Sequence, residues 1–304
     1  MCYSAMIEES WRDYCRAFNA QLDWEEWLRL FHAREKDLSL KIPDGTELQL
    51  IAFGGQESME IRRSQVAYRQ LDAMRIKLEL EGVEAALREI EARKPSKTKE
   101  KDLGIKGRKR DRLLAALNSP SYDTGSVRIY PYQFAPVIRI GADGRRLLSP
   151  MRYRVLPRTG VEVPPRYNVF NARRDSLMGP DAARTWRPMF GKMHGLFPFT
   201  RFYEWVDRGG KKVEITFNPD GYDNMWSAAL FEETPVEWGM LRSFAMVTDE
   251  PPPEVAAAGH DRCPIFLASE LIEQWLHPAG QSLEQLDALF DHKEPTYYSH
   301  ALVA

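Results

Sequence analysis

Apolar positions in the first part of the chain recur at the three- and four-residue spacing of amphipathic helices. Two short helices are indicated near the start, one over residues 11–18 and one that follows a capping box at residues 23–26. A longer apolar pattern runs from about Glu57 to Arg93 and predicts the longest helix of the chain. Between these helices, residues 46–52 alternate apolar with polar side chains, which predicts a short strand ending at two glycines.

From Val127 onward the pattern changes to short strands separated by turns. Residues 137–140 and 146–148 flank a Gly-Ala-Asp-Gly turn, and residues 203–206 and 213–217 flank Gly209-Gly210. Both arrangements predict β-hairpins. There is neither βαβ alternation nor a glycine-rich phosphate loop, so Rossmann and P-loop nucleotide-binding enzymes are excluded. The pattern indicates an α+β fold with an antiparallel β-sheet or barrel core and flanking helices.

Composition narrows the class of protein further. The 304 residues include 43% hydrophobic residues and carry a net charge of −2, so no overall charge attracts nucleic acid. The three cysteines, Cys2, Cys15 and Cys263, form no CxxC pair, and we expect neither a disulfide framework nor a metal, and no cofactor. No apolar run spans a bilayer and no signal peptide is evident, so we expect a cytoplasmic protein without a membrane partner.

One segment departs from this neutral balance. Residues 93–112 hold ten basic and three acidic side chains, a local charge of +7, and Pro95, Gly104 and Gly107 are expected to interrupt any helix there. One interpretation is a solvated, mobile linker. The other is an arm that contacts phosphates, whose affinity would fall steeply with salt.

Cys2 offers chemistry that an internal cysteine lacks. Removal of Met1 would leave an α-amine and a thiol on adjacent carbons. The amine, with a reference pKa of roughly 7.7–8.0, condenses with an aldehyde to an imine, and the thiol then closes a thiazolidine ring. Cys15 lies on an apolar helical face, where a small buried side chain is the expected role.

Four short motifs in a fixed order resemble the SRAP family, named for SOS response-associated peptidases. They are Met1-Cys2, Phe-Asn-Ala-Arg-Arg-Asp-Ser at 170–176, Phe-Tyr-Glu-Trp at 202–205 and Gly-His-Asp-Arg-Cys-Pro at 259–264. Supporting matches are Phe134-Ala135-Pro136, residues 153–157, residues 228–231 and Val247-Thr248. The resemblance covers residues 1–4 and about 127–276, roughly half of the chain.

The resemblance implies a discontinuous domain organisation. We expect an SRAP-like catalytic domain within residues 1–280, made of about 1–8 and 121–280. A helical insertion over residues 9–120, which contains the basic segment 93–112, would interrupt it and contact either DNA or a protein partner. Residues 281–304 are expected to form a C-terminal tail.

The resemblance also implies a function, an abasic-site sensor in the DNA damage response. Proteins of this family crosslink the N-terminal cysteine to abasic sites in single-stranded DNA, and a lyase or self-processing peptidase activity is associated with them. By residue, Cys2 would be the nucleophile, Asn171 would hold the reacting end, Glu204 would shuttle protons and His260 would assist dehydration and reversal. Three further positions match family residues near the DNA: Arg173, Thr248 and Pro136. The family implies a bacterial or phage-encoded protein, cytoplasmic and associated with the nucleoid when bound to DNA.

The chain departs from the family pattern at three places. Tyr3-Ser4 replaces the usual Gly-Arg after Cys2, and Thr200-Arg201 replaces the Asp-Gly before the Tyr-Glu-Trp motif. Arg158-Thr159-Gly160 stands where relatives have a Trp-rich stretch. Since a base-stacking platform is lost there, we expect binding to depend more on charge.

Two other functions remain open from the residues alone. Cys2, His260 and Asn171 also supply the Cys/His/Asn set of a cysteine peptidase or self-processing hydrolase. Alternatively, residues 93–112 serve a non-covalent nucleic-acid-binding module. Taken singly, the Tyr-Glu-Trp motif is also typical of a half-buried strand with its Glu in solvent, and residues 260–262 of a surface turn with a local ion pair.

Overall fold

The computed structural model describes residues 4–8, 10–118, 127–179 and 185–303 of the chain. These residues belong to two compact units. The barrel unit comprises residues 1–30, 40–43 and 127–304, and the helical unit comprises residues 31–39 and 44–126. Residues 11–30 fall inside the span expected for the insertion, yet they belong to the barrel unit.

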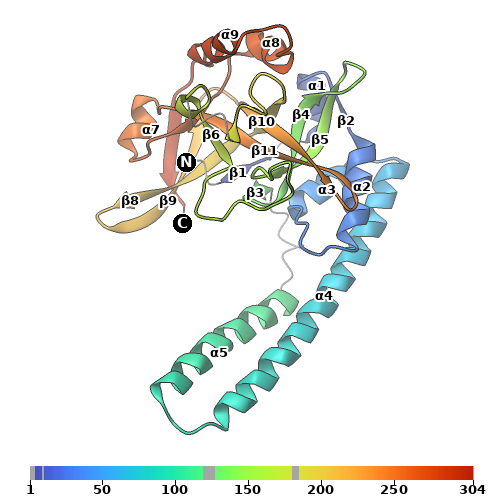
Figure 1. Cartoon of the computed structure of the whole chain (residues 1–304), viewed down its shortest axis with the longest axis vertical. Coiled ribbons are helices and arrows are strands. Elements are labelled where there is room, and N and C mark those ends of the chain that lie inside the picture. The colour runs from blue at the N-terminus through green and yellow to red at the C-terminus, as the bar shows by residue number, and fades with distance from the viewer. Residues whose placement is uncertain (1–3, 9, 119–126, 180–184, 304) are drawn as a thin grey trace. The chain divides into compact units, whose positions relative to one another are not determined.

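The core of the barrel unit is a closed ring of strands (Figure 1). Strand β11 pairs with β10, β10 with β7, β7 with β4 and β4 with β5, and a parallel pairing of β5 with β11 closes the ring. The bounds are β4 Phe134–Ile140, β5 Arg146–Tyr153, β7 His194–Phe199, β10 Met225–Val236 and β11 Gly239–Asp249. The predicted hairpin around residues 141–144 is confirmed, and so is the α+β class with a barrel core.

A second sheet, in the order β13-β9-β8-β1-β3, lies beside this ring in the barrel unit. Its strands are β1 Ser4–Met6, β3 Arg128–Ile129, β8 Arg201–Arg208, β9 Lys211–Pro219 and β13 Tyr298–Leu302. The β8–β9 pair confirms the second predicted hairpin. Strand β1 pairs antiparallel with β8, so Ser4–Met6 lie next to the Tyr-Glu-Trp motif.

Short elements add to the ring and cover it. They are α1 Trp11–Ala17, β2 Ala20–Leu22, α2 Trp24–Arg34, β6 Asn171–Arg173, the 3-10 helix η2 Arg174–Ser176, α7 Pro253–Ala257, β12 Cys263–Pro264, η3 Ser269–Leu271, α8 Ile272–Leu276, α9 Leu283–Ala288 and η4 Leu289–Asp291. Both predicted N-terminal helices are present as α1 and α2. Residues 281–304, expected as a tail, contain α9, η4 and β13, and β13 pairs with β9 along five residues.

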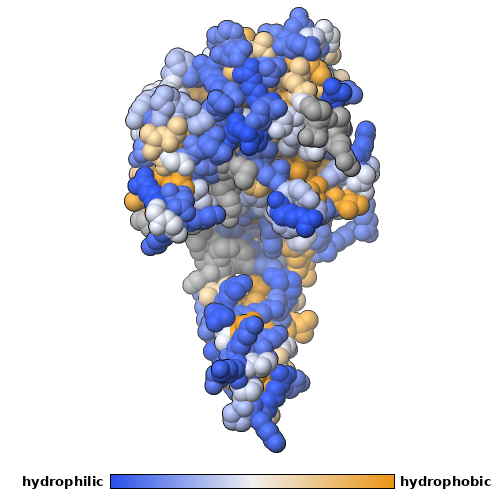
Figure 2. Space-filling view, turned by 60° about the vertical axis from the view of Figure 1, so that its left-hand side comes forward, coloured by the Kyte–Doolittle hydropathy of each residue, from blue (hydrophilic) through white to orange (hydrophobic). Residues whose placement is uncertain are grey.

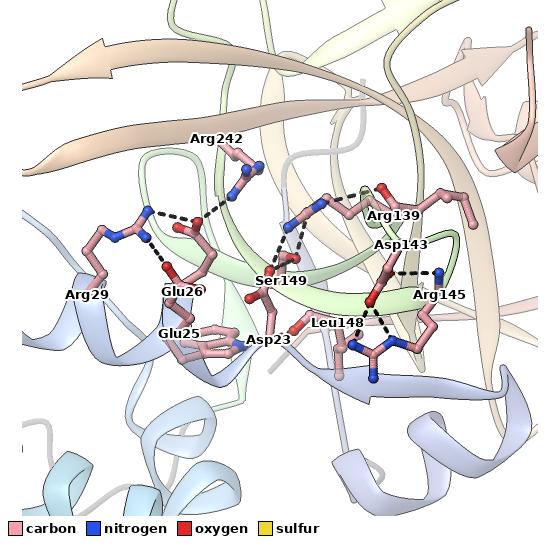
Figure 3. A network of polar contacts seen from close by, with 12 residues as sticks. Asp23, Glu25, Glu26, Arg29, Arg139, Asp143, Arg145, Leu148, Ser149 and Arg242 are labelled. Carbon is pink, nitrogen blue, oxygen red and sulfur yellow. Dashed lines mark hydrogen bonds and ion pairs between the residues drawn. The ribbon is translucent and has the colours of Figure 1, made fainter.

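A buried polar network fastens β2 and α2 to the ring (Figure 3). The Asp23 carboxylate lies 2.7 Å from Arg139 Nη2 and accepts a hydrogen bond of 2.5 Å from Ser149 Oγ. Arg139 Nε donates to the same Ser149 oxygen at 2.9 Å. On the next turn of α2, the indole of Trp27 donates to Leu148 O at 3.1 Å. Because β2 also pairs in parallel with β5, residues 20–27 are tied to one strand by backbone and side chains together.

The helical unit is built from α3 Asp44–Phe53, α4 Gln56–Glu91 and α5 Lys97–Asn118. The predicted strand over residues 46–52 is wrong, because these residues form α3. Buried Thr46, Glu47 and Leu50 share one helical face, while Leu48 is 47% exposed. Glu47 is buried because Arg34 pairs with it at 2.5 Å and Gln65 donates to it at 2.5 Å. A short alternating pattern cannot reveal such a buried ion pair.

Helices α4 and α5 form a long hairpin (Figure 1). The long helix predicted from about Glu57 to Arg93 is confirmed as α4. The expectation that Gly104 and Gly107 interrupt a helix is wrong, since both lie inside α5. A glycine costs a helix only about 1 kcal/mol, and the surrounding Lys, Arg, Leu and Ala residues favour helix. Pro95 lies between the two helices, where proline ends a helix without distorting it.

The surface of the α4–α5 hairpin is mostly polar. Figure 2 shows the hairpin as a largely hydrophilic surface with scattered apolar side chains. Within the described ranges, no helix combines the length and the apolar character that crossing a membrane requires.

Candidate active site on the barrel unit

Glu204 lies on the inner face of β8. Alternation along the strand places Phe202, Glu204 and Val206 on one face, each at most 2% exposed, whereas Trp205 on the other face is 46% exposed. The alternative of a Glu in solvent is therefore wrong. Burial raises the pKa of the Glu204 carboxyl above its ordinary value, with a smaller opposing effect of the hydrogen bond from His260. A carboxyl group of this kind holds its proton to higher pH than an exposed one.

The backbone that precedes His260 forms a Schellman motif at the end of α7. The N–H of His260 bonds Val255 O at 3.2 Å and the N–H of Gly259 bonds Ala256 O at 2.9 Å. This arrangement requires a left-handed residue, and Gly259 has φ +97°. The glycine thus turns the chain out of α7 and delivers His260 to the interior, where it is 7% exposed.

Glu204 and His260 form a buried pair. Glu204 Oε2 lies 3.1 Å from His260 Nε2. On the other side of the ring, Nδ1 lies 2.8 Å from Arg262 O, and the backbone N–H of Arg262 donates to Nδ1 at 3.3 Å. The contact between Nε2 and the Glu204 carboxylate is short enough for a proton to pass between the two groups, which is the arrangement that general acid and base catalysis needs.

Asn171 opens strand β6 and is 2% exposed. In the parallel pairing of β6 with β11, Asn171 lies opposite Met246. Tyr153, which stacks on Phe244 in the barrel core at 5.1 Å, points its hydroxyl at Asn171 Oδ1 at 3.4 Å. The backbone N–H of Asn171 bonds Asn168 Oδ1 at 3.1 Å. The side chain of Asn171 is therefore positioned from both the barrel core and the preceding loop.

The loop before β6 is held by a buried arginine. Arg154 is 2% exposed and has φ +110°, a left-handed conformation that costs energy for any residue with a Cβ. Its Nη2 donates to the carbonyl oxygens of Val163, Pro164 and Tyr167 at 3.0–3.2 Å. The loop lines a pocket of about 790 Å³, and Asn168 contributes to its wall. Arg154 thus fixes the loop from which Asn168 positions Asn171.

Arg173 and Thr248 occur as neighbours in the β6–β11 register. Asp175 accepts from Arg173 Nη2 at 2.6 Å and from Arg262 Nη2 at 2.9 Å, so this carboxylate bridges the Asn-Ala-Arg motif to the histidine motif. The guanidinium of Arg173 is 42% exposed, which leaves it accessible to a phosphate. Thr248 is buried, and its Oγ1 has no hydrogen-bond partner among the described residues.

The remaining predicted site residues lie elsewhere or outside the described ranges. Pro136 lies opposite Pro150 in the β4–β5 pair, and β5 separates β4 from β11. Cys2 lies outside the described residues. The two described cysteines are protonated at neutral pH, because burial raises the pKa of Cys15 to about 11 and that of Cys263 to about 12. Neither is an activated nucleophile.

Sequence reasoning assigned no role to Arg154, Tyr153 or Asn168. Tyr153 and Arg154 belong to the supporting family match at residues 153–157, and Asn168 carries a local signal, since an Asn three residues before a strand is typical of an Asx turn. A local ion pair within residues 260–262 was one expectation, but Arg262 pairs with Asp175 instead. In the described part of the chain, no group of three or more His, Cys, Asp or Glu side chains has the geometry to hold a metal ion.

The chain matches one protein family and several curated proteins. Residues 96–303 match the SRAP family, described as SOS response associated peptidase. The protein is 28% identical over 155 residues to the abasic site processing protein YoaM of Bacillus subtilis, covering 50% of this chain and 66% of YoaM. It is 26% identical over 155 residues to the abasic site processing protein YobE of the same bacterium, covering 50% of this chain and 68% of YobE. The chain thus spans just under two thirds of YoaM.

A phage relative and solved structures are similar as well. The abasic site processing protein YoqW of Bacillus phage SPbeta is 27% identical over 156 residues, covering 50% of this chain and 66% of YoqW. A crystal structure from Bacteroides thetaiotaomicron has a TM-score of 0.47 at 16% identity, covering 59% of this chain and 78% of that one. A phage-related protein from Bordetella bronchiseptica has a TM-score of 0.46 at 23% identity, covering 59% and 81%. Because the family match extends over more than half of the chain, this protein belongs to the SRAP family.

Proposed function

We propose that this protein processes abasic sites in single-stranded DNA by forming a covalent adduct through Cys2. The observation that carries the proposal is the buried Glu204–His260 pair. Glu204 lies on β8, the strand with which β1 pairs. Ser4 of β1 lies opposite Tyr203, the residue before Glu204. Cys2 precedes Ser4 by two residues, and because a chain spans at most about 3.6 Å per residue, these two residues reach no further than about 7 Å from Ser4. The names of the relatives support abasic sites as the target.

The chemistry balances without a cofactor. After removal of Met1, the neutral α-amine of Cys2 adds to the C1 aldehyde of a ring-opened abasic sugar and gives a carbinolamine. Loss of water, with a proton from the Glu204 carboxyl to the departing hydroxyl and return of the nitrogen-bound proton to the Glu204 carboxylate, gives the imine. The Cys2 sulfur then adds to the imine carbon and the nitrogen takes up the thiol proton, which closes a thiazolidine. No oxidant or reductant is consumed.

The other site residues take binding and proton-transfer roles in this scheme. His260 Nε2 returns a proton to Glu204 or removes one from it, because the two groups share a hydrogen bond. The Asn171 amide both donates and accepts without titrating, which suits it to hold the sugar in one orientation. Arg173 and Thr248, with Pro136 further along the ring, are proposed to contact the DNA. We propose that the same Glu204–His260 pair also supports reversal of the adduct or strand cleavage as an abasic-site lyase.

The test is adduct formation with an oligonucleotide that carries one abasic site. Wild-type protein is expected to give a product that survives denaturation, and Cys2→Ala is expected to give none. Cys15→Ser is the matched control, since its thiol is partly buried and its pKa is raised, and it is expected to react as wild type. An undiminished adduct in Cys2→Ala, or no adduct with wild type, would sink the proposal.

Peptide hydrolysis is the second candidate, because the family description names a peptidase. A hydrolase of this kind would use the same Cys2 and His260 but would need no abasic sugar. Turnover of a peptide substrate, or cleavage within the chain that Cys2→Ala abolishes, would favour the hydrolase over the crosslinking protein.

A further inference from the structure

We propose that one face of α5 is a second binding surface, which contacts the phosphate backbone of single-stranded DNA outside the reacting site. The surface consists of Lys97, Lys101, Arg108 and Arg112, called here the α5 stripe. The choice of DNA as the ligand rests on the proposed function. The existence of an anion-binding surface does not.

The spacing of these four residues aligns them. An α-helix turns by 100° per residue, so steps of four, seven and four residues leave all four side chains within about 60° of one another. All four are exposed, and so are Ile105 and Ala115 between and beyond them. At 1.5 Å rise per residue, the stripe extends for about 22 Å. Such a row of cations has room for several consecutive phosphates of an extended strand.

Three other cations of the hairpin have partners within it. Lys109 pairs with Glu79 of α4 at 2.7 Å. Arg110 bonds Asp111 at 2.8 Å and feels the charges of Glu84 and Glu91, which raise the pKa of its guanidinium. Lys99 donates to the carbonyl oxygens of Glu91 and Arg93 at 2.7 and 2.8 Å. The charges of these side chains are therefore engaged in contacts within the hairpin.

The α5 stripe differs in this respect. Among the described residues, none of its four side chains makes an ion pair or a hydrogen bond with another side chain or with the backbone. In the described part of the chain, the acidic residues of α4 and α5 thus form no ion pair with these four side chains. Four like charges on one helix face repel one another, so a helix retains them at a cost in stability unless an anion binds.

A polyanionic strand fits this surface better than a lipid bilayer. A helix that lies on a membrane needs a broad apolar face opposite its cations. The exposed large apolar side chains of α5 are only Ile105 and Leu114. Phosphates at regular intervals instead match a linear row of exposed Lys and Arg side chains, which contact the backbone without reading sequence.

The experiment compares two variants of the full chain with equal net charge. One replaces the stripe, Lys97→Gln, Lys101→Gln, Arg108→Gln and Arg112→Gln. The control replaces four other cations of α5, Lys99→Gln, Lys106→Gln, Lys109→Gln and Arg110→Gln. Glutamine is a good helix former, and circular dichroism verifies that both variants keep the hairpin. The probe is a labelled single-stranded oligonucleotide of 30 nucleotides without an abasic site, and anisotropy reports binding at 50 and 200 mM salt.

Four phosphate contacts contribute about 3 to the slope of log affinity against log salt for a single strand. Wild-type protein is therefore expected to lose about 50-fold more affinity than the stripe variant between the two salt concentrations, while the control keeps the wild-type slope. Equal loss in both variants would overturn the proposal in favour of a non-specific charge effect. An unchanged stripe variant would overturn it outright. Binding of wild type to vesicles of anionic lipid, with none to the oligonucleotide, would replace the DNA by a membrane surface.

A separate readout distinguishes this inference from the proposed function. Adduct formation on a short abasic oligonucleotide at saturating concentration is expected to be the same in the stripe variant and wild type, because the stripe takes no part in the bond-forming steps. If no adduct forms with any variant but the salt slopes differ as described, the proposed function fails and the α5 stripe stands. If adducts form and the salt slopes of wild type and the stripe variant coincide, only the proposal of the α5 stripe is refuted.

Discussion

The site on the barrel unit and the α5 stripe use charge in opposite ways. Glu204, His260 and Arg262 are at most 8% exposed, and each has a partner within hydrogen-bond distance. The cations of the α5 stripe are exposed and lack partners among the described residues. Burial raises the pKa of Glu204, whereas exposed charges act over the roughly 8 Å Debye length of physiological salt. The first arrangement suits proton transfer, and the second suits attraction of a polyanion.

The largest expected effect is on the chemistry. Glu204→Gln keeps the shape of the side chain but removes its proton transfer, so the single-turnover rate of adduct formation is expected to fall by about 10²- to 10⁴-fold. Affinity for an oligonucleotide without an abasic site is expected to stay unchanged. Asp207→Asn, on the exposed part of the same strand, is the control and is expected to react as wild type. Loss of activity in both variants would indicate a general effect on β8.

The pH profile sharpens this prediction. The rate rises with pH while the Cys2 amine loses its proton, whose reference pKa is roughly 7.7–8.0. The raised pKa of Glu204 means that its proton is lost at higher pH than from an exposed Glu, so the wild-type rate falls on the alkaline side once that proton leaves. Glu204→Gln is expected to lack this alkaline fall. Identical profiles for the two proteins would contradict the role of Glu204 as the acid.

The second prediction concerns folding stability and contrasts buried with exposed ion pairs in one region (Figure 3). Asp23→Asn leaves the Arg139 guanidinium, whose side chain is 12% exposed, without a charged partner. The cost is expected to be about 3 kcal/mol, measured by urea unfolding. Asp143→Asn removes an ion pair whose partners are 46% and 60% exposed and is expected to leave the unfolding midpoint unchanged. Equal effects would show that burial does not decide the strength of these pairs.

The third prediction concerns the loss of folding stability at acid pH. His194 accepts from Gly191 N at 2.9 Å through Nε2 and bonds Trp275 O at 2.8 Å through Nδ1, so the folded protein requires the neutral ring. Burial lowers its pKa from 6.5 to about 4. Because the unfolded chain binds this proton more readily, the contribution is complete above pH 6.5 and is lost as the pH falls towards 4, by about 3 kcal/mol. His194→Gln is expected to lose less stability between pH 7 and 4.5 than wild type, which unfolding at both pH values checks.

The smallest expected effect comes from replacing one glycine by alanine in each of the two regions. Gly259→Ala forces a side chain into a left-handed conformation and is expected to destabilise the barrel unit by about 1–2 kcal/mol. Gly107→Ala, inside α5 with nothing within 4 Å of the added methyl group, is expected to stabilise the helical unit by up to about 1 kcal/mol. Thermal unfolding separates the two signs. A loss of stability at both positions would contradict the helical environment of Gly107.

Much of the barrel unit could be predicted from local sequence. Gly-rich turns between alternating strands indicate hairpins, and two such hairpins are present as β4–β5 and β8–β9. The parallel pairing of β5 with β11 could not be predicted, because it joins residues about ninety positions apart and depends on no local signal. The motif order indicated Glu204 and His260 as a set. Their 3.1 Å contact arises from the Schellman turn at Gly259, which composition alone does not reveal.

The helical unit was harder to predict for a physical reason. Residues 46–52 have apolar side chains at alternate positions, yet the fold buries Glu47 against Arg34 and makes the segment a helix. The basic segment contains two glycines, yet the surrounding Lys, Arg, Leu and Ala residues favour helix and keep it helical. In residues 46–52 tertiary contacts outweigh the local pattern, whereas in α5 the neighbouring residues outweigh a glycine cost of about 1 kcal/mol each. The charge pattern was nevertheless informative, since the four exposed cations of the α5 stripe were visible in the sequence.

The most direct test of the central claim is the site of the covalent bond. Wild-type protein is treated with an abasic oligonucleotide, digested with nuclease and protease, and its N-terminal peptide is weighed by mass spectrometry. The account predicts a peptide that begins at Cys2, lacks Met1 and carries the sugar remnant with the mass of an aldehyde adduct less one water. An adduct on any other residue, or on a peptide that retains Met1, would contradict it.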